Sequence, residues 1–402
     1  MFKKILLSPW TALFTLALVL LVRVTDPTFV ESVRLRYFDT LISSRAPTEN
    51  TIVTVDIDEA SLSKYGQWPF PRGTYAHIIE DLYARKAGLV VLNSVFAESD
   101  RFHQDSELAQ MMKHYPVVIA NVPGDKTKNN PRNPGSAVLG PEFLDQIITY
   151  PGMIANVPVI ENAAAGIGTI NTLPEVDGVN RRIPLIVTVG DKLYPNLALE
   201  TLRVAAGDST FQVKLFEGGV EKMRIPKFGP IATDSLSRIW IDWSLVPDRY
   251  SLTDLPKDFD GEIVIVGVSA QGISNPIATA RGEMLPQDLQ ASILGTVIAN
   301  KDRPVITRPD WADGAEIIAL LVVGILLIFL SRWTYVGIFS SLFITGACIP
   351  LSSFLYRTDA WLIDCTTLVG GLILVSLHTY GVEFVSEFLQ KQAIKKQFAG
   401  YC

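Results

Sequence analysis

The sequence predicts a membrane protein that combines one large α/β domain, built on a mainly parallel sheet, with four transmembrane helices. Two observations support this fold class. Four apolar stretches each approach the ~20 residues that a helix needs to cross a ~30 Å hydrocarbon core. Between the first and the second stretch lies a long segment of ordinary globular sequence. The four stretches, one N-terminal and three C-terminal, are residues 5–22, 314–331, 335–356 and 361–381.

The basic residues that flank these stretches predict the orientation of the chain. Lysine and arginine concentrate on the cytoplasmic side of membrane helices. The flanking residues that follow this rule are Lys3, Lys4, Arg332, Lys391, Lys395 and Lys396. We therefore expect residues 1–4 and 382–402 in the cytoplasm and residues 23–312 outside it. Arg23 and Arg357 oppose this assignment as single charges, and a cleaved signal peptide is the alternative interpretation of the N-terminus.

Composition excludes several classes of function. The net charge of −6 and the acidic pI near 5.4 argue against a nucleic-acid partner. The three cysteines are Cys348 and Cys365, inside apolar stretches, and Cys402. None lies in the large domain, so no disulfide is expected there. The histidines show no metal-ligand spacing, and no nucleophile–base arrangement is visible. We expect no catalytic residue, metal or cofactor in this chain.

Short, continuous apolar runs within the large domain indicate strands that are buried on both faces, as in a parallel sheet. These runs are Ile52–Val55, Leu89–Leu92, Val117–Ala120 and Ile263–Val266. Segments with helical periodicity lie between and after them, at Tyr75–Arg85, Asn196–Ala206 and Asp288–Ala299. This alternation favours an α/β layered domain. A hairpin with its turn at Gly190–Asp191 is expected to interrupt it.

Polar residues follow each expected strand, and ligands bind beyond the carboxyl ends of strands in open α/β sheets. The candidate ligand-binding residues at these positions are Asp56, Asp58, Asn93, Asn121, Ser269 and Gln271. A loop that carries Trp68 and Arg72 adds an aromatic ring and a guanidinium able to hold a carboxylate. The alternative is structural, because Asp, Asn and Ser also cap helices and turns, and loop aromatics also cover the edge of a core.

Several motifs, taken in order, resemble the CHASE2 extracellular sensor domain. They are Phe38-Asp39 with Arg45, the stretch Ile52–Leu62, the loop Trp68–Arg72, Leu89–Phe96, Asp177–Leu185 and Glu262–Gly267. The resemblance covers roughly residues 30–300. It implies a sensor between one N-terminal and three C-terminal spans in a bacterial cytoplasmic (inner) membrane, surrounded by membrane lipid. It also implies an unknown extracytoplasmic ligand or exported protein as partner.

The resemblance further implies an output domain, commonly a class III adenylate or guanylate cyclase and less often a histidine or Ser/Thr kinase. Residues 388–402 resemble the linker that leads into such a cyclase. We therefore expect this chain to be the input half of a receptor, ending before the cyclase. The cyclase's Mg or Mn ion and its ATP would bind only that absent domain. Three positions depart from the family pattern, at Asn93, Asn275 and Gln287, and they suggest an altered pocket.

The resemblance implies a homodimer, because class III cyclases form their active sites between two catalytic domains. The sequence adds a short apolar seam at Val382, Val385, Phe388, Leu389 and Gln392, and glycines within the apolar stretches. The same glycines are equally suited to packing within one four-helix bundle. A different interpretation of the whole chain is a membrane-anchored structural protein, whose exported domain binds another exported protein.

Overall fold

The computed structural model describes residues 9–132, 135–140 and 144–399. These residues fall into two compact units, one formed by Met1–Ser44 with Ile306–Cys402 and the other by Arg45–Val305. Lys3, Lys4 and the beginning of the expected first span lie outside the described residues, as does Cys402.

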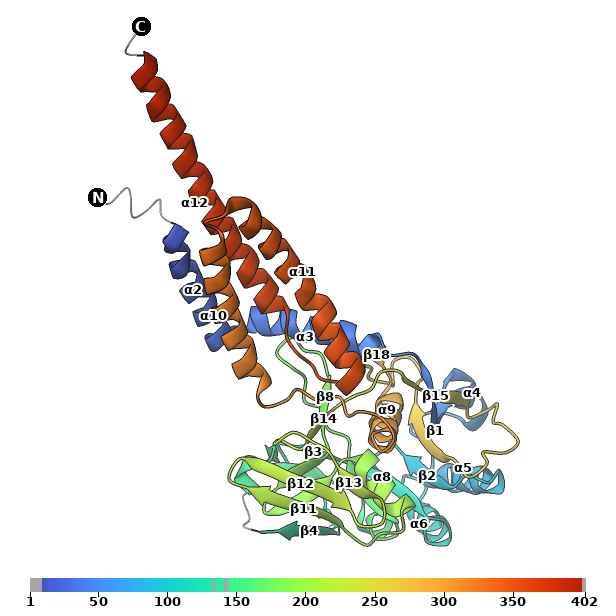
Figure 1. The fold of residues 1–402 in the computed structure, drawn as a ribbon. Helices are drawn as coiled ribbons and strands as arrows, with labels where there is room; N and C mark the ends of the chain where they lie inside the picture. Colours follow the sequence, from blue (N-terminus) through green and yellow to red (C-terminus); the bar gives the residue numbers. More distant parts are fainter. Residues whose placement is uncertain (1–8, 133–134, 141–143, 400–402) are drawn as a thin grey trace. The chain divides into compact units, whose positions relative to one another are not determined.

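The Arg45–Val305 unit, which we call the α/β unit, is organised around a seven-stranded sheet (Figure 1). Its strands are β1 (Thr48–Ile57), β2 (Leu89–Leu92), β3 (Val117–Gly124), β6 (Gly152–Ile154), β7 (Gly166–Thr169), β15 (Leu245–Ser251) and β16 (Ile263–Val268). Neighbours along the order β15-β1-β16-β2-β3-β7 are all parallel, and β6 pairs antiparallel with the last residues of β3. The expected mainly parallel sheet is confirmed, including its four continuous apolar runs.

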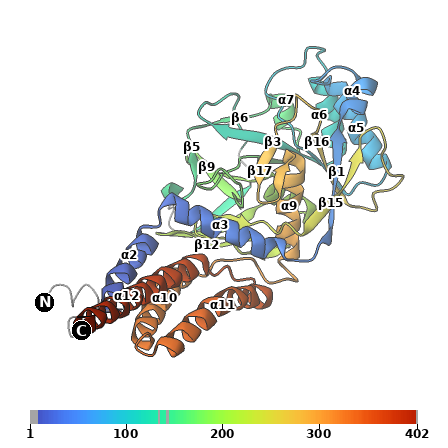
Figure 2. The ribbon, with the colours of Figure 1, turned by 90° about the horizontal axis from the view of Figure 1, so that it is seen from above.

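Helices cover both faces of this sheet, which explains why its central strands are apolar on both sides. The helices of the unit are α4 (Glu59–Tyr65), α5 (Arg72–Ala84), α6 (Asp105–His114), α7 (Pro158–Glu161), α8 (Leu197–Ala205) and α9 (Pro286–Ala299). Figures 1 and 2 show α5 on one side of β1 and α9 on the other. Val53, Val55 and Ile57 of β1 pack in the same core cluster as Ile79 and Leu82 of α5. Asp56, with the opposite parity, therefore faces α9.

The remaining strands form small sheets around this core. They are β4 (Ser136–Leu139), β5 (Thr149–Tyr150), β8 (Arg182–Pro184), β9 (Ile186–Val189), β10 (Lys192–Pro195), β11 (Phe211–Phe216), β12 (Gly219–Ile225), β13 (Gly229–Ile231), β14 (Arg238–Trp240), β17 (Ile277–Thr279) and β18 (Gly282–Met284), with a short helical turn, η2, at Leu144–Gln146. Strands β9 and β10 form the expected hairpin, with Gly190 at φ 64° in its turn. Strands β13-β12-β11-β4 form a four-stranded sheet.

The other unit, which we call the helical unit, contains the apolar stretches. Its elements are η1 (Pro9–Thr11), α2 (Ala12–Thr25), α3 (Thr28–Ser43), α10 (Ala312–Leu330), α11 (Thr334–Asp359) and α12 (Thr366–Ala399). Among the described residues, α10, α11 and the Thr366–Lys396 part of α12 are long and apolar enough to cross a membrane. The three expected C-terminal apolar helices are therefore present.

The N-terminal stretch differs from a single straight span. Helix α2 ends at Thr25, where Asp26 adopts a left-handed conformation with φ 42° and ψ 60°, and α3 then begins at Thr28. The two helices are bent by 76° relative to each other, and they add a fourth crossing only if the pair counts as one span. The proline at Pro27 explains the break, because its ring disfavours a helical conformation at Asp26.

Two kinds of contact hold α2 within the helical unit. Leu16 of α2 lies against Gly324 of α10, where an added Cβ would come within 2.6 Å of the Leu16 Cδ1 atom. An added Cβ at Gly371 of α12 would meet Val19 at the same distance. At the end of α2, the buried Arg23 donates to Glu316 at 2.7 Å and to Asp313 at 2.5 Å. Arg23, which opposed the expected orientation as a single charge, is thus neutralised by carboxylates.

Candidate functional site

A cavity of about 250 Å³ lies at the carboxyl ends of β2 and β16, where an open parallel sheet is expected to bind ligands. We call it the strand-end cavity. The first turns of α5 and α9 contribute Arg72 and Pro286 to its wall, and the residue after β7 contributes Ile170. The complete lining is Trp68, Pro69, Arg72, Tyr75, Asn93, Ser94, Val95, Phe96, Ile170, Val268, Ile273, Ser274, Asn275, Pro286 and Gln287.

Three residues that the sequence singled out line this cavity together, namely Trp68, Arg72 and Asn93. The aromatic loop places Trp68 beside Tyr75, with ring centroids 6.3 Å apart. The expected role of Arg72 as a free carboxylate clamp is not supported by its contacts. Its Nη2 atom donates to the Glu98 carbonyl at 2.9 Å, and its Nε atom lies 3.3 Å from the Asp105 carboxylate.

Three buried polar atoms of lining residues have no hydrogen-bond partner among the described residues, namely the Oδ1 atom of Asn93, the hydroxyl oxygen of Ser274 and the Nε atom of Arg72. The last of these still lies in an ion pair with Asp105, whereas the first two have no charged neighbour of this kind. An unpaired buried polar atom costs about 1–3 kcal/mol, so native structures rarely leave such atoms unsatisfied without a reason. The unpaired atoms of Asn93 and Ser274 in the wall of one cavity make it a candidate ligand site.

Asp56 does not line the cavity, but it contacts a residue that does. Its Oδ1 atom accepts a hydrogen bond of 2.8 Å from the Nε2 atom of Gln287, which does line the cavity. The other carboxylate oxygen lies 3.6 Å from the Nε atom of Arg249, and Arg249 also pairs with Asp288. Asp56 and Asp288 are only 6% and 4% exposed, so Arg249 lies beside two buried carboxylates, one in β1 and one in the first turn of α9.

Asp58, Ser269 and Gln271 lie outside the lining of the cavity. Asp58 caps α4, and its Oδ1 atom accepts from the backbone and hydroxyl of Ser61 at 2.9 and 2.7 Å. Partial burial alone would raise the pKa of Asp58, but these hydrogen bonds lower that pKa below its ordinary value. Ser269 and Gln271 use their backbone N–H groups to close the turn after β16. The structural alternative for these residues is the one the contacts favour.

Asn121 belongs to a separate buried network. Its Nδ2 atom donates to Glu161 at 3.1 Å, and its Oδ1 atom accepts from Asn156 at 2.7 Å. Asn156 donates to Glu161 as well, at 2.9 Å. All three side chains are at most 2% exposed. The network holds α7 against the end of β3, so Asn121 is occupied by structural contacts.

Sequence reasoning did not single out Tyr75, Phe96 and Ser274, which line the cavity. Asn275 and Gln287, where the chain departs from the family pattern, line it too. Burial raises the pKa of the Tyr75 phenol, so the group remains neutral. Gln287 follows Pro286 at the start of α9. Tyr75 lies in α5, Phe96 follows β2 and Ser274 follows β16, so only the packing of these elements brings the three residues to one wall.

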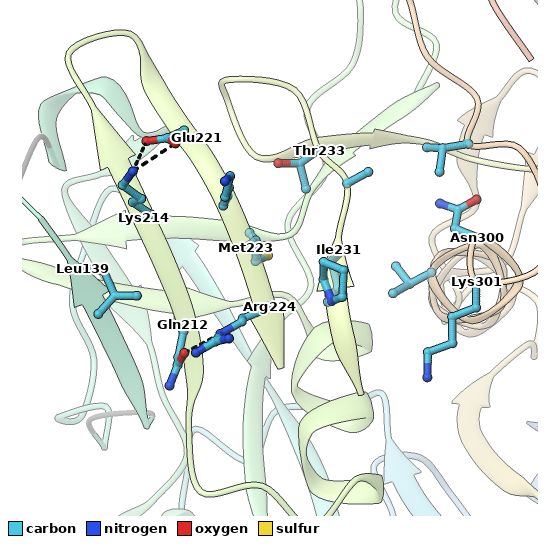
Figure 3. A pocket seen from close by; sticks show the side chains of 15 residues that line it. Leu139, Gln212, Lys214, Glu221, Met223, Arg224, Ile231, Thr233, Asn300 and Lys301 are labelled. Carbon is cyan, nitrogen blue, oxygen red and sulfur yellow. Dashed lines mark hydrogen bonds and ion pairs between the residues drawn. The ribbon is translucent and has the colours of Figure 1, made fainter. Parts of the chain in front are cut away.

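A larger hollow of about 870 Å³ lies elsewhere in the α/β unit, over the sheet formed by β11, β12 and β13 and beside the end of α9 (Figure 3). Of its charged side chains, Lys214 pairs with Glu221 at 2.8 Å, Arg224 donates to Gln212 at 2.6 Å and Lys301 lies over the Phe228 ring. None of its described lining residues carries an unpaired buried polar atom. The smaller strand-end cavity is therefore the better candidate for a specific site.

The described residues contain no group of three or more histidine, cysteine, aspartate or glutamate side chains arranged to hold a metal ion.

Comparison with known families identifies one domain. The model of the CHASE2 domain matches residues 14–327, which include the entire α/β unit. No curated protein matches the chain, and no solved structure does. The family match covers more than half of the sequence and agrees with the motif order found there. The chain is therefore a member of the CHASE2 domain family, a family of extracellular sensor domains found in cyclase and kinase receptors.

Proposed function

We propose that this chain is the sensor and membrane-coupling part of a receptor that controls a class III nucleotidyl cyclase, most simply an adenylate cyclase. The strand-end cavity receives the stimulus, and the C-terminal helix delivers the response. The family supports the sensor part, and the apolar helices support attachment to a membrane. The homodimer, the cyclase and the bacterial cytoplasmic membrane, with the α/β unit in the periplasm, are part of this proposal.

The observation that carries the proposal is the continuity of α12. This helix runs without a break for 34 residues, from Thr366 to Ala399. At 1.5 Å per residue it is about 51 Å long, which exceeds the ~30 Å thickness of the hydrocarbon core. Its second half carries exposed charges, including the ion pair of Glu387 with Lys391. A continuous helix of this length transmits a rotation or shift from one membrane surface to a domain beyond the other.

The same half of α12 supports pairing of two chains. Phe384, Val385, Phe388, Leu389 and Ile394 are between 45% and 72% exposed. Phe384 and Phe388 stack along one side of the helix, with ring centroids 6.5 Å apart. Apolar side chains at three- and four-residue spacing on an exposed helix are typical of a two-helix seam. We propose that this seam joins two copies and brings two output domains together.

A helix-phase experiment tests this function. Residues 1–402 are fused to a class III cyclase catalytic domain, and one to seven alanines are inserted after Lys396. Because each residue turns a helix by about 100°, we expect cyclase activity to vary periodically and to return near its starting value after seven insertions. Activity that does not depend on insertion length would contradict coupling through α12. The same series fused to a histidine kinase domain distinguishes a kinase output.

A matched pair of substitutions tests the seam. Phe388→Ser removes an apolar residue from the exposed stripe, whereas Gln390→Ser changes a neighbouring exposed polar residue. We expect the first to abolish dimers of the nanodisc-embedded protein in mass measurements, and the second to leave them intact. Monomers of the unchanged chain well above micromolar concentration would refute the dimer.

A further inference from the structure

We infer that the strand-end cavity binds a small, flat, uncharged molecule that presents both a hydrogen-bond donor and an acceptor, as a carboxamide or a nitrogen heterocycle does. This inference rests on the proposed sensor function and names the chemical class of the stimulus. Three features of the cavity support it: its lack of a free charge, the unpaired polar atoms of Asn93 and Ser274, and its aromatic wall.

The wall offers no free charge to an ionic ligand. Arg72 is the charged residue among the described residues that line the cavity, and Asp105 neutralises its guanidinium. The guanidinium also stacks over the Phe96 ring, with 4.6 Å between its central carbon and the ring centroid. An anion would have to compete with Asp105 for this group, and a cation would find no carboxylate among the described lining residues. Burying an unpaired ion costs far more than burying a neutral polar group.

The unpaired polar atoms define what the ligand must supply. Asn93 and Ser274 approach the cavity from different segments, one directly after β2 and the other in the turn after β16. An amide side chain and a hydroxyl group can each donate and accept hydrogen bonds. A ligand that combines a donor with an acceptor satisfies both residues at once, because it supplies partners to the two atoms that have none among the described residues.

The aromatic residues define the shape of the ligand. Trp68, Tyr75 and Phe96 all line the cavity, and the Tyr75 and Phe96 rings meet edge to face, with centroids 5.0 Å apart. Flat rings pack favourably against such a wall. A cavity of about 250 Å³ accommodates a single ring with one polar substituent and lies at the small end of ligand sites.

Three probes of the same shape and different charge test this inference, namely benzamide, benzoate and benzylammonium. The full chain in nanodiscs is labelled with 5-fluorotryptophan, and the fluorine resonance of Trp68 is assigned among the seven tryptophans with Trp68→Phe. We expect benzamide to shift this resonance saturably at millimolar concentration, and the two charged probes to bind at least tenfold more weakly. Equal binding of either ion, or no shift with any probe at tens of millimolar, would overturn the inference.

Substitutions sharpen the test. Asn93→Asp adds a carboxylate to the wall and should shift the preference from benzamide to benzylammonium. Asn300→Asp adds the same charge at the far end of α9, outside the cavity, and should leave the preference unchanged. Ser274→Ala should weaken benzamide binding about fivefold, the value of one hydrogen bond. An unchanged preference in Asn93→Asp would overturn the inference.

Ligand binding is measured at Trp68, whereas coupling to the output is measured as cyclase activity. Failure of the binding inference therefore does not imply failure of the proposed function, and the reverse also holds.

Discussion

The Nε2 atom of Gln287 donates a hydrogen bond of 2.8 Å to the Oδ1 atom of Asp56 and thereby joins the start of α9 to the end of β1. The two residues are 231 positions apart in the sequence. Gln287 also lines the strand-end cavity, whereas Asp56 lies behind it beside Arg249. A ligand in the cavity is thus one hydrogen bond away from the buried charges that fix α9 to the sheet.

Gln287→Leu should destabilise the α/β unit, because it removes a donor from a carboxylate that is only 6% exposed. Hydrogen bonds to charged groups contribute about 1.5–3 kcal/mol, and we expect a loss of that size. Urea unfolding followed by tryptophan emission measures it. Gln271→Leu is the matched control at an exposed glutamine, where the change should stay within about 0.5 kcal/mol. Equal losses in both variants would show that the bond to Asp56 contributes nothing.

The pair of Arg181 with Asp177 predicts a pH dependence. Arg181 is 1% exposed and donates to both carboxylate oxygens, at 2.7 and 2.9 Å, and these bonds lower the pKa of Asp177. A lowered pKa stabilises the fold above the pKa of the unfolded carboxyl, near 4, and this contribution disappears as pH falls through the folded value. Arg181→Leu should therefore cost about 3–5 kcal/mol at pH 7 and less below pH 4.

The control for this variant is Lys86→Leu, which breaks an exposed pair with Asp258. Surface pairs contribute about 0–1 kcal/mol, so this loss should be small. Unfolding of both variants at pH 7 and at pH 3.5 provides the comparison. A loss in Arg181→Leu that is the same at both pH values would contradict the assigned role of Asp177.

Asn121, within β3, and Asn93, directly after β2, should respond differently to the same substitution. Asn121→Asp places a second buried carboxylate beside Glu161, which now accepts a hydrogen bond from Asn121. We expect a loss of about 3 kcal/mol or more, and a larger loss at pH 8 than at pH 5, because protonation of either carboxyl relieves the repulsion. Asn93→Asp should cost less, because Asn93 lines a cavity and its Oδ1 atom is unpaired. Thermal unfolding at both pH values measures the two losses of stability. A larger loss in Asn93→Asp than in Asn121→Asp would contradict the prediction.

Two glycines of the helical unit should differ in how well they tolerate a larger side chain. Gly324→Leu should destabilise the unit by about 1–3 kcal/mol, because a side chain there meets Leu16 of α2. Gly346→Leu in α11 should be tolerated, since no atom from another part of the described chain lies within 4 Å of the position that a Cβ would take there. Thermal unfolding in detergent compares the two variants. Equal tolerance at both positions would mean that α2 does not pack closely on α10.

The proposed orientation predicts which surface sites a membrane-impermeant thiol reagent reaches in intact cells. In a chain without its three native cysteines, Lys222→Cys in the α/β unit should react directly. Lys391→Cys, which is 75% exposed on α12, should react only after the cells are permeabilised. Direct labelling of Lys391→Cys would overturn the proposed topology.

The sequence by itself determined the layered architecture and the membrane attachment. Continuous apolar runs such as Leu89–Leu92 predicted strands of a parallel sheet, because only a sheet that is covered on both faces buries every residue of a strand. The apolar stretches predicted α10, α11 and α12, because length and hydrophobicity alone decide whether a helix can cross a bilayer. The motif order predicted the family. These properties depend on local composition, so they could be seen in the chain.

The tertiary structure alone decided which polar strand ends form a site. Asn93 and Asn121 have the same side chain, and each follows an apolar run that predicts a strand, yet Asn93 lines the cavity, whereas Asn121 lies within β3 and is held by Asn156 and Glu161. Likewise, the sequence left Arg72 open as a carboxylate clamp or a structural residue, and in the structure its guanidinium pairs with Asp105. Hydrogen-bond partners that are distant in sequence determine these differences. Their positions follow from how the strands and helices pack, which no local pattern records.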